Sequence, residues 1–320
     1  MKVLITGASS GIGRDMAREF AERKYDLVLV ARDEKRLNEL KTELEVKYKI
    51  NVKIVVKDLS EEENCISLYE ENKDIDILVN NAGFGVFGEF TKTDLQKELN
   101  LIKTNVIAVH ILTKLYLKDM VQKDNGRILN VSSIAGSMPG PLMCAYYSSK
   151  SYVLRLSEGI REELNKKKSN VKISVLQPGP VNTNFNNVAG VKFNLSSKSS
   201  EYVAKYAIKY FLKGKFNIVP GFMIKCAKFL SKITPDFFVA KICYHMQEKK
   251  KWYIVNDRVQ LGPGLFRALF HRDRVFLVHF QVIPFEQNLC NTMYQKDPVP
   301  MEQCPKKTRS QLNNNPSPSR

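Results

Sequence analysis

The sequence predicts an α/β fold, a doubly wound parallel sheet of seven strands, followed by amphipathic helices and a tail. Short apolar runs rich in Val, Ile and Leu alternate with helical patterns up to about residue 221. Strands that alternate with helices at this spacing require right-handed crossovers and therefore form a parallel sheet. A glycine-rich turn after the first run is the third observation, because such turns join strand to helix in nucleotide-binding folds.

The turn follows the apolar run Val3 to Ile5 with the spacing G-x-x-x-G-x-G. Gly7 lets the chain turn sharply off the strand, and Gly11 lets the backbone approach a phosphate. Gly13 lets the new helix pack closely on the sheet. The free N–H groups and the positive dipole end of that helix favour a pyrophosphate. The candidate phosphate-binding residues are Gly7, Ser9, Ser10, Gly11, Ile12 and Gly13.

Apolar periodicity defines the elements of the first half of the chain. Apolar residues recur at helical spacing from Ile12 to Lys24, and Leu37, Leu40 and Leu44 form the stripe of a helix over 33–48. Between them, continuous apolar residues predict a buried strand. The strands expected here, after the first run, are 26–31, 52–56 and 75–79.

The second half continues the alternation. A long helix over 94–122 contains Asn105, and a second helix spans 145–167. A polar, asparagine-rich loop runs from Asn182 to about Ser199, and a further helix ends near Lys213. The strands expected in this half are 127–131, 171–176 and 216–219.

Residues 222–251 are predicted to be a lysine-rich appendage of two amphipathic helices separated by Pro235. Lys225, Lys228 and Lys232 lie at helical spacing on one side of the first helix. Four large apolar residues lie opposite them: Phe222, Met223, Phe229 and Leu230. Residues 1–221 form the predicted domain, and residues 252–320 an extension that is largely irregular or disordered. We assign no helix or strand to the apolar runs within 260–285.

Charge and composition narrow the class of protein. The chain has 50 basic and 33 acidic residues, a formal net charge of +17. Residues 205–251 concentrate eleven lysines against two acids, which indicates a local anionic partner. No nucleic-acid-binding motif accompanies them, so nucleic acid is not expected. The six cysteines form no C-x-x-C pair and the four histidines are dispersed, so we expect reduced, buried thiols and no metal.

The sequence shows no signal peptide and no apolar run near the roughly 20 residues that a membrane span requires. The protein is therefore expected in the cytoplasm, with weak peripheral membrane contact through 222–251 as an option.

These motifs together resemble the short-chain dehydrogenase/reductase family in its single-domain form. They fall in the family's order and spacing over residues 1 to about 221, and residues after Trp252 lie outside the resemblance. The motifs are Thr6-Gly7-x-x-x-Gly11-Ile12-Gly13, Asp58, Asn80-Asn81-Ala82-Gly83, Asn105, Ser133, Tyr146-x-x-x-Lys150 and Pro178-Gly179. The resemblance implies a Rossmann fold, a nicotinamide cofactor, a small carbonyl or alcohol substrate, and a homo-oligomer.

The predicted catalytic residues are Asn105, Ser133, Tyr146 and Lys150. Tyr146 and Lys150 are four residues apart, so they share a helix face. An ammonium and an oxidised nicotinamide nearby favour the phenolate and lower the tyrosine pKa from about 10, which suits proton exchange with an alcohol. Ser133 follows the fifth strand and would hydrogen-bond the substrate oxygen. The resemblance implies that Asn105 supports a water chain to the lysine.

Each catalytic assignment has an alternative. Tyr146 and Tyr147 both fit packing positions on an amphipathic helix, and Lys150 fits a solvated charge. Tyr147 is the local rival of Tyr146, but it stands three residues from the lysine rather than four. Ser132 is the rival of Ser133, and we expect its side chain on the other face of the strand end.

The resemblance extends the cofactor site beyond the turn. It places Asp58 at the adenine ring, Asn81-Ala82-Gly83 beside the adenosine half, and Pro178-Gly179 near the nicotinamide. Alternatively, these are a helix cap, a plain turn and a strand end. The remaining cofactor candidates are Leu59, Val181 and Thr183, together with Tyr146 and Lys150.

The end of the second strand favours NADP over NAD. An acid at this place accepts hydrogen bonds from the ribose hydroxyls and repels a 2′-phosphate, whereas an arginine does the opposite. Here the strand ends with Ala31, where NAD-preferring members of the family usually place the acid, and Arg32 follows. Asp33 is an acid that would favour NAD, or alternatively it only caps the next helix. Ser10 also lacks the basic side chain of some NADP-dependent members.

Two functions remain open. The first is an NADP(H)-dependent oxidoreductase that acts on a carbonyl and secondary-alcohol pair, and the second is a catalytically silent NADP(H)-sensing protein. The complete set of catalytic residues favours the first. Apolar residues around the expected pocket favour a lipid, steroid or acyl substrate: Phe185, Val188, Phe193, Phe222 and Phe229. The apolar face of the lysine-rich helices either closes over this pocket, as amphipathic helices usually do, or lies in an anionic membrane surface.

Overall fold

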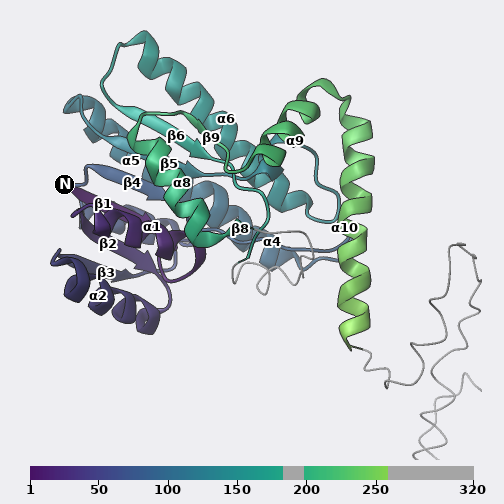
Figure 1. The fold of residues 1–320 in the computed structure, drawn as a ribbon, viewed down its shortest axis with the longest axis horizontal. Coiled ribbons are helices and arrows are strands. Elements are labelled where there is room, and N and C mark those ends of the chain that lie inside the picture. The colour runs from purple at the N-terminus through teal and green to yellow at the C-terminus, as the bar shows by residue number, and fades with distance from the viewer. Residues whose placement is uncertain (183–197, 259–320) are drawn as a thin grey trace, which may run out of the picture. The chain divides into compact units, whose positions relative to one another are not determined.

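The structure, a computed structural model, describes residues 1–182 and 198–258 of the chain. Its centre is a seven-stranded sheet in the order β3-β2-β1-β4-β5-β6-β9, in which every neighbouring pair is parallel (Figure 1). The strand order reverses between β1 and β4, and such a switch point is where open α/β sheets bind ligands at the carboxyl ends of their strands. This is a Rossmann fold, and the predicted doubly wound parallel sheet is confirmed.

The strands lie close to the predicted runs because they are buried on both faces. Val3, Leu4 and Ile5 of β1 are completely buried, and such strands read as continuous apolar runs. Val181–Asn182 (β7) and Lys198–Ser199 (β8) form a separate two-stranded parallel pair. The strands of the main sheet are β1 Lys2–Thr6, β2 Asp26–Ala31, β3 Val52–Val56, β4 Ile77–Asn80, β5 Arg127–Val131, β6 Lys172–Leu176 and β9 Asn217–Ile218.

Helices cover both faces of the sheet. Apolar residues of α1, α2 and α8 form one core cluster with the strands, and Phe20 of α1 meets Phe211 of α8 edge to face. Residues of α3, α5 and α6 form the second cluster on the opposite face, and Tyr116 is its largest fully buried side chain. The helices are α1 Gly11–Glu22, α2 Glu34–Tyr48, α3 Glu62–Glu70, α4 Leu95–Ile102, α5 Ala108–Gln122, α6 Cys144–Lys166, α8 Ser200–Leu212, α9 Phe222–Ile233 and α10 Asp236–Arg258.

Two short segments were not anticipated. The helix expected over 94–122 is interrupted by a π-helical segment, η1 (Lys103–Ile107), which contains Asn105. A 3-10 helix, η2 (Ile134–Ser137), follows β5. Side-chain periodicity does not reveal one widened helical turn, because it displaces the pattern by only one residue. A second difference is that α10 continues to Arg258, beyond the predicted end near residue 250.

The lysine-rich helices α9 and α10 are oriented differently from the favoured prediction. The expectation that their apolar face closes over a pocket is wrong, because Phe222 and Phe229 are 77% and 65% exposed. The expectation of solvated lysines fails at Lys228, which is 7% exposed. The physical reason is that α9 contacts the domain through a narrow stripe that contains Lys228, so its wider apolar face points outward.

Within residues 1–182 and 198–258, no helix is long and apolar enough to cross a membrane. The four cysteines of this part are free, and Cys65 and Cys243 are buried, but Cys144 is exposed, contrary to prediction. The irregular or disordered extension predicted for 252–320 lies almost wholly outside the described residues and stays a prediction.

Candidate active site

Tyr146, Lys150 and Ser133 come together at the carboxyl end of β5. Tyr146 and Lys150 lie one turn apart on α6, and the Lys150 Nζ is 5.9 Å from the centroid of the Tyr146 ring. The side chains of Tyr146 and Ser133 share a hydrogen bond. Ser133 also donates through Oγ to the Pro178 carbonyl, at 3.4 Å. The three side chains that the sequence singled out are therefore neighbours.

Lys150 is held in the protein interior by a main-chain partner. Its side chain is buried, and its Nζ donates to the Val131 carbonyl at 2.9 Å. Burial lowers the pKa of Lys150 to about 8, because desolvation disfavours the charged form. Lys150 is thus not the solvated charge of the alternative interpretation.

The two serines after β5 point to different partners. Ser132 Oγ donates to the main-chain carbonyl of Lys150 at 2.7 Å, whereas Ser133 lies against Tyr146. Gly136 in η2 permits this close approach, since a Cβ there would lie 2.5 Å from the same carbonyl oxygen. These contacts agree with the expectation that the side chains of Ser132 and Ser133 point to different sides of the strand end.

The predicted lowering of the Tyr146 pKa relied on Lys150 together with an oxidised nicotinamide, and the protein groups alone act in the opposite direction. Burial raises this pKa to about 12, and the hydrogen bond with Ser133 opposes the rise. The lysine contributes little because its ammonium is bonded to Val131 and remains 5.9 Å from the ring centroid. Desolvation of the phenolate therefore dominates.

Tyr147 has partners of its own, apart from Ser133. Its hydroxyl accepts a hydrogen bond of 2.7 Å from Gln247 Nε2 of α10. Its ring covers Gly140, where a Cβ would lie 1.9 Å from the Tyr147 Cγ. Burial raises the pKa of Tyr147 as well. These contacts give the two adjacent tyrosines separate surroundings.

Asn105 lies in η1, and its side chain ties three segments together. It is completely buried, its amide donates to the Phe84 carbonyl and to Ser149 Oγ, both at 3.0 Å, and its Oδ1 accepts from the Phe84 N–H at 3.1 Å. A Cβ at Gly83 would lie 2.8 Å from this Oδ1 and 3.2 Å from the Lys150 Nζ. Asn105 thus belongs to the same cluster as Lys150, and π-helical turns are frequent at functional sites.

The glycine turn is pinned to the segment after β4. Gly7 and Gly11 have φ of +65° and +54°, the region that favours glycine. A Cβ at Gly13 would lie 2.3 Å from the Gly7 carbonyl oxygen, so α1 lies directly against the turn. Asn81 donates through Nδ2 to the carbonyls of Thr6 and Gly7, at 2.9 and 3.2 Å. This bonding gives Asn81 a structural task in addition to its predicted place in the cofactor site.

The start of α1 fits an anionic group. Ser10 is the N-cap residue, and its side chain makes no capping hydrogen bond. The first N–H groups of the helix therefore lack the side-chain acceptor that usually satisfies them. Together with the missing Cβ at Gly11, this arrangement suits the pyrophosphate of a dinucleotide.

Arg32 and Asp58 meet at the carboxyl ends of β2 and β3. The Arg32 side chain is 72% exposed, and its guanidinium is 3.4 Å from the Asp58 carboxylate. Burial acts to raise the pKa of Asp58, but hydrogen bonds from Ser60 and the charge of Arg32 lower it overall. Asp58 does not cap α3, whose N-cap residue is Glu61. Arg32 is accessible to a further anionic partner.

Asp33 is a helix cap. Its side chain accepts a hydrogen bond of 3.0 Å from the Arg36 N–H at the start of α2. The carboxylate that spoke against NADP is therefore engaged locally.

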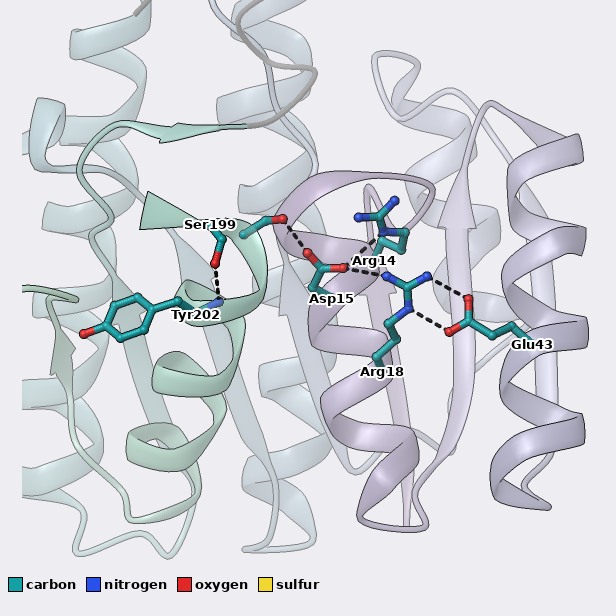
Figure 2. Close-up of polar contacts among 7 residues, drawn as sticks. Arg14, Asp15, Arg18, Glu43, Ser199 and Tyr202 are labelled. Carbon is teal, nitrogen blue, oxygen red and sulfur yellow. Dashed lines mark hydrogen bonds and ion pairs between the residues drawn. The ribbon is translucent and has the colours of Figure 1, made fainter. Parts of the chain in front are cut away.

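Sequence reasoning missed a basic hollow beside the glycine turn. Arg18 binds Glu43 with two hydrogen bonds, of 2.8 and 2.7 Å, and Asp15 at 3.0 Å (Figure 2). Arg14 also reaches Asp15, whose other oxygen accepts from Ser200 at the start of α8. The hollow, of about 440 Å³, is lined by Ser9, Ser10, Gly11, Arg14, Arg18, Arg36, Glu39, Leu40, Glu43 and Ser200. Only the spacing of Arg14 and Arg18, one helical turn apart after the glycines, could have signalled it.

The other predicted cofactor residues are distributed around the same edge. The Pro178 carbonyl accepts from the Ile134 N–H at 3.0 Å, and a Cβ at Gly179 would lie 2.5 Å from Ile224 Cδ1 of α9. Val181 is in β7, and Leu59 is buried after β3. A Cβ at Gly7 would lie 2.9 Å from the Ala82 Cα, so Ala82 lies against the glycine turn, and Gly83 lies beside Asn105 and Lys150. Thr183 lies outside the described residues, as do the pocket candidates Phe185, Val188 and Phe193.

The lysine-rich helices touch this edge with their inner sides. Ser231 of α9 donates to the Ser137 carbonyl at 3.5 Å, and the sulfurs of Cys243 and Met138 are 3.7 Å apart. Both contacts fall on η2 or directly after it. The helices therefore border the Ser133–Tyr146 cluster, although Phe222 and Phe229 face away from it.

Comparison with known proteins agrees with this arrangement. A family model described as "short chain dehydrogenase" matches residues 1–192. The NADP-dependent 3-hydroxy acid dehydrogenase of Schizosaccharomyces pombe is 36% identical over 209 residues, which cover 63% of this chain and 79% of that protein. The very-long-chain 3-oxoacyl-CoA reductase of Anas platyrhynchos is 31% identical over 198 residues, which cover 60% of this chain and 63% of that protein, less than two-thirds of its length.

Among solved structures, a short-chain dehydrogenase from Sphingobium yanoikuyae in complex with NADPH superposes with a TM-score of 0.67. The two chains are 27% identical, and the superposition covers 82% of this chain and 97% of the other.

Proposed function

The chain belongs to the short-chain dehydrogenase family of oxidoreductases, and from that premise we propose that it is an NADP(H)-dependent enzyme that interconverts a carbonyl and a secondary alcohol. The observation that carries the proposal is the contact of Ser133 with Tyr146, one helical turn from the buried Lys150. Following the rest of the family, we also infer that the protein forms a homo-oligomer.

The catalytic side chains divide the reaction between them. When bound, the nicotinamide supplies or accepts the hydride. The hydroxyls of Ser133 and Tyr146 would both hydrogen-bond the substrate oxygen, where charge develops. A pKa of about 12 keeps Tyr146 protonated at neutral pH, and the positive charge of an oxidised nicotinamide would lower it toward the range in which a tyrosine gives its proton to the substrate oxygen efficiently. The ammonium of Lys150 would stabilise the phenolate that remains.

We propose an apolar substrate of the acyl, lipid or steroid type. The side chains that border the cluster from the lysine-rich helices include Ile224, which lies against Gly179, and Cys243, which lies against Met138. The name of the Anas platyrhynchos relative, a very-long-chain 3-oxoacyl-CoA reductase, supports the same class. Phe222 and Phe229 no longer contribute to this proposal, because both are exposed on the outer side of α9.

A panel of apolar ketones and aldehydes, assayed by NADPH oxidation, tests the proposal. Tyr146→Phe is expected to lower kcat by roughly 10²–10⁴-fold, the usual contribution of a positioned acid, with little change in NADPH affinity. Tyr147→Phe is the matched control, since it removes a neighbouring hydroxyl that binds Gln247. Loss of turnover with Tyr147→Phe but not with Tyr146→Phe would refute the assignment. NADPH binding without turnover of any substrate would favour a nucleotide sensor.

We propose NADP(H) rather than NAD(H) as the cofactor. The exposed guanidinium of Arg32 supports this choice, and Asp33 does not oppose it because its carboxylate caps α2. The name of the Schizosaccharomyces pombe relative, an NADP-dependent enzyme, agrees.

Arg32→Asp tests the cofactor choice. The loss of a charge-assisted contact costs on the order of 1.5–3 kcal/mol, so the NADPH dissociation constant should rise by roughly 10- to 150-fold. The NADH dissociation constant should stay equal or fall. Isothermal titration with both nucleotides measures this, and an unchanged NADPH dissociation constant would exclude Arg32 as the determinant.

A further inference from the structure

The outer sides of α9 and α10 expose a concentration of large apolar side chains. Ten of them lie within residues 222–246 and are 40–77% exposed. The rest of the described chain has ten such residues spread over more than 200 positions. The ten on these helices are Phe222, Met223, Phe229, Leu230, Ile233, Phe237, Phe238, Ile242, Tyr244 and Met246. Apolar surface gathered in this way marks a contact site for a protein or a membrane.

The outward orientation of these side chains is fixed by contacts on the inner side. On α9 the inner stripe contains Lys228 and Ser231, and Ser231 bonds to the Ser137 carbonyl. On α10, Cys243 and Gln247 are buried one turn apart and reach Met138 and Tyr147. Both helices are therefore anchored to the domain, and their apolar side faces away from it.

The charges on the same two helices indicate what this surface binds. Lys225, Lys232 and Lys241 are exposed, and in the sequence three further lysines follow at 249–251. Residues 222–258 carry seven lysines and one arginine against three acids, Asp236, Glu248 and Asp257. A second copy of the chain would bring the same positive charges to the contact, which repels it. An anionic lipid surface instead attracts the lysines while its acyl region accepts the apolar side chains.

We propose that α9 and α10 form a docking surface for anionic lipid membranes. The apolar side chains enter the boundary between headgroups and acyl chains, and the exposed lysines contact the headgroups. The attachment is peripheral and reversible, because it combines a few apolar side chains with a few charges. It does not depend on the reaction proposed for the active site.

Vesicle flotation of the full-length chain tests the proposal directly. One set of vesicles contains phosphatidylcholine alone, and the other contains phosphatidylcholine with phosphatidylserine. We expect binding to the second set at low salt, weaker binding as salt rises, and little binding to the first set. Each lysine near an anionic surface strengthens binding about fivefold, so Lys225→Ala with Lys232→Ala should weaken it roughly 25-fold.

Matched variants separate this surface from the net charge of the protein. Lys35→Ala with Lys166→Ala removes two exposed lysines elsewhere, on α2 and α6, and should change binding little. Met223→Ser with Phe229→Ser should abolish binding, whereas Val46→Ser, at a 66% exposed site on α2, should preserve it.

Three results would overturn the proposal. The full-length chain could fail to float with phosphatidylserine vesicles at low salt. The control lysine pair could weaken binding as much as Lys225→Ala with Lys232→Ala, which would indicate attraction by net charge alone. Finally, the parent chain could fail to bind vesicles, while Met223→Ser with Phe229→Ser lowers the oligomeric mass measured by sedimentation. That result would assign the surface to a second copy of the chain.

Discussion

Two buried lysines, Lys150 in the candidate active site and Lys228 in α9, have different hydrogen-bond surroundings. Both are less than 10% exposed, and burial lowers the pKa of each to about 8. The ammonium of Lys150 donates to the Val131 carbonyl. The Nζ of Lys228 has no hydrogen-bond partner in the part of the chain that the structure describes. A buried ammonium with a hydrogen-bond partner recovers part of its desolvation cost. A buried ammonium without such a partner recovers none of it from hydrogen bonding.

The difference extends from the lysines to their surroundings. In the sheet region, apolar side chains are inside and the buried amide of Asn105 is bonded, and the buried side-chain atoms without a partner among the described residues are the uncharged oxygens of Asn80 and Ser174. In α9 a lysine is inside, and Phe222 and Phe229 are outside. The sheet region thus follows the usual rule of a globular core, and α9 inverts it. This inversion is what a second, apolar environment on the outer side would explain.

The largest expected effect is on kcat, which should depend on Lys150 but not on Lys228. Lys150→Met should lower kcat by roughly 10²–10⁴-fold, since it removes the charge beside Tyr146. Lys228→Met should leave kcat within about threefold of the parent, because Lys228 contacts none of the proposed catalytic residues. Steady-state NADPH oxidation measures both. An equal loss of kcat in the two variants would show that Lys150 and Lys228 do not differ in their effect on the reaction.

A smaller effect on stability should run in the opposite direction. Lys228→Met replaces an unpartnered ammonium by an apolar chain of similar length, so the free energy of unfolding should rise by on the order of 2–3 kcal/mol. Urea denaturation followed by circular dichroism gives this value. The exposed Lys232→Met on the same helix is the control, expected within about 0.5 kcal/mol of the parent. A destabilised Lys228→Met protein would mean that the ammonium has a stabilising partner.

The smallest effect is a dependence of stability on pH. Burial, and then the charge of Lys232, depress the pKa of Lys228 in the folded state to about 8, while an unfolded lysine has a pKa near 10.4. Between these values the unfolded state binds more protons, so the free energy of unfolding rises with pH. The gain from pH 8 to pH 10 should be about 1–2 kcal/mol and should shrink in Lys228→Met. Lys150, with a pKa that burial also lowers, leaves a residual slope. An identical slope in parent and variant would show that Lys228 does not titrate in this range.

Much of the fold and part of the site follow from local patterns. The strands β2, β3 and β5 have the predicted bounds, because a strand buried on both faces is a continuous apolar run that can be recognised without its neighbours. The proximity of Tyr146 and Lys150 follows from helical spacing alone. The glycine turn is equally local, since its conformation depends on the residues that form it.

Other features depend on residues that are distant in the sequence. The basic hollow combines Arg14 and Arg18 of α1 with Glu43 of α2 and Ser200 of α8, which only the fold brings together. The pKa of Tyr146 is raised by burial, and burial is a property of the assembled domain. The π-helical turn at Asn105 is accompanied by hydrogen bonds from the amide of that side chain to the Phe84 carbonyl and to Ser149 Oγ. None of these partners can be read from the periodicity of a single segment.

The lysine-rich helices show most clearly which features the sequence determines and which depend on tertiary packing. Their sequence determined how side chains follow one another around the axis of α9: Lys225, Lys228 and Lys232 form one stripe and Phe222 and Phe229 lie beside it, because residues three and four apart are neighbours on a helix surface. The sequence did not determine which face turns inward. That choice depends on the contact of Ser231 with Ser137, and on those of α10 with Met138 and Tyr147, which hold the helices in place. Helical periodicity fixes how side chains are arranged around an axis, but only packing against the rest of the molecule fixes the rotation about that axis.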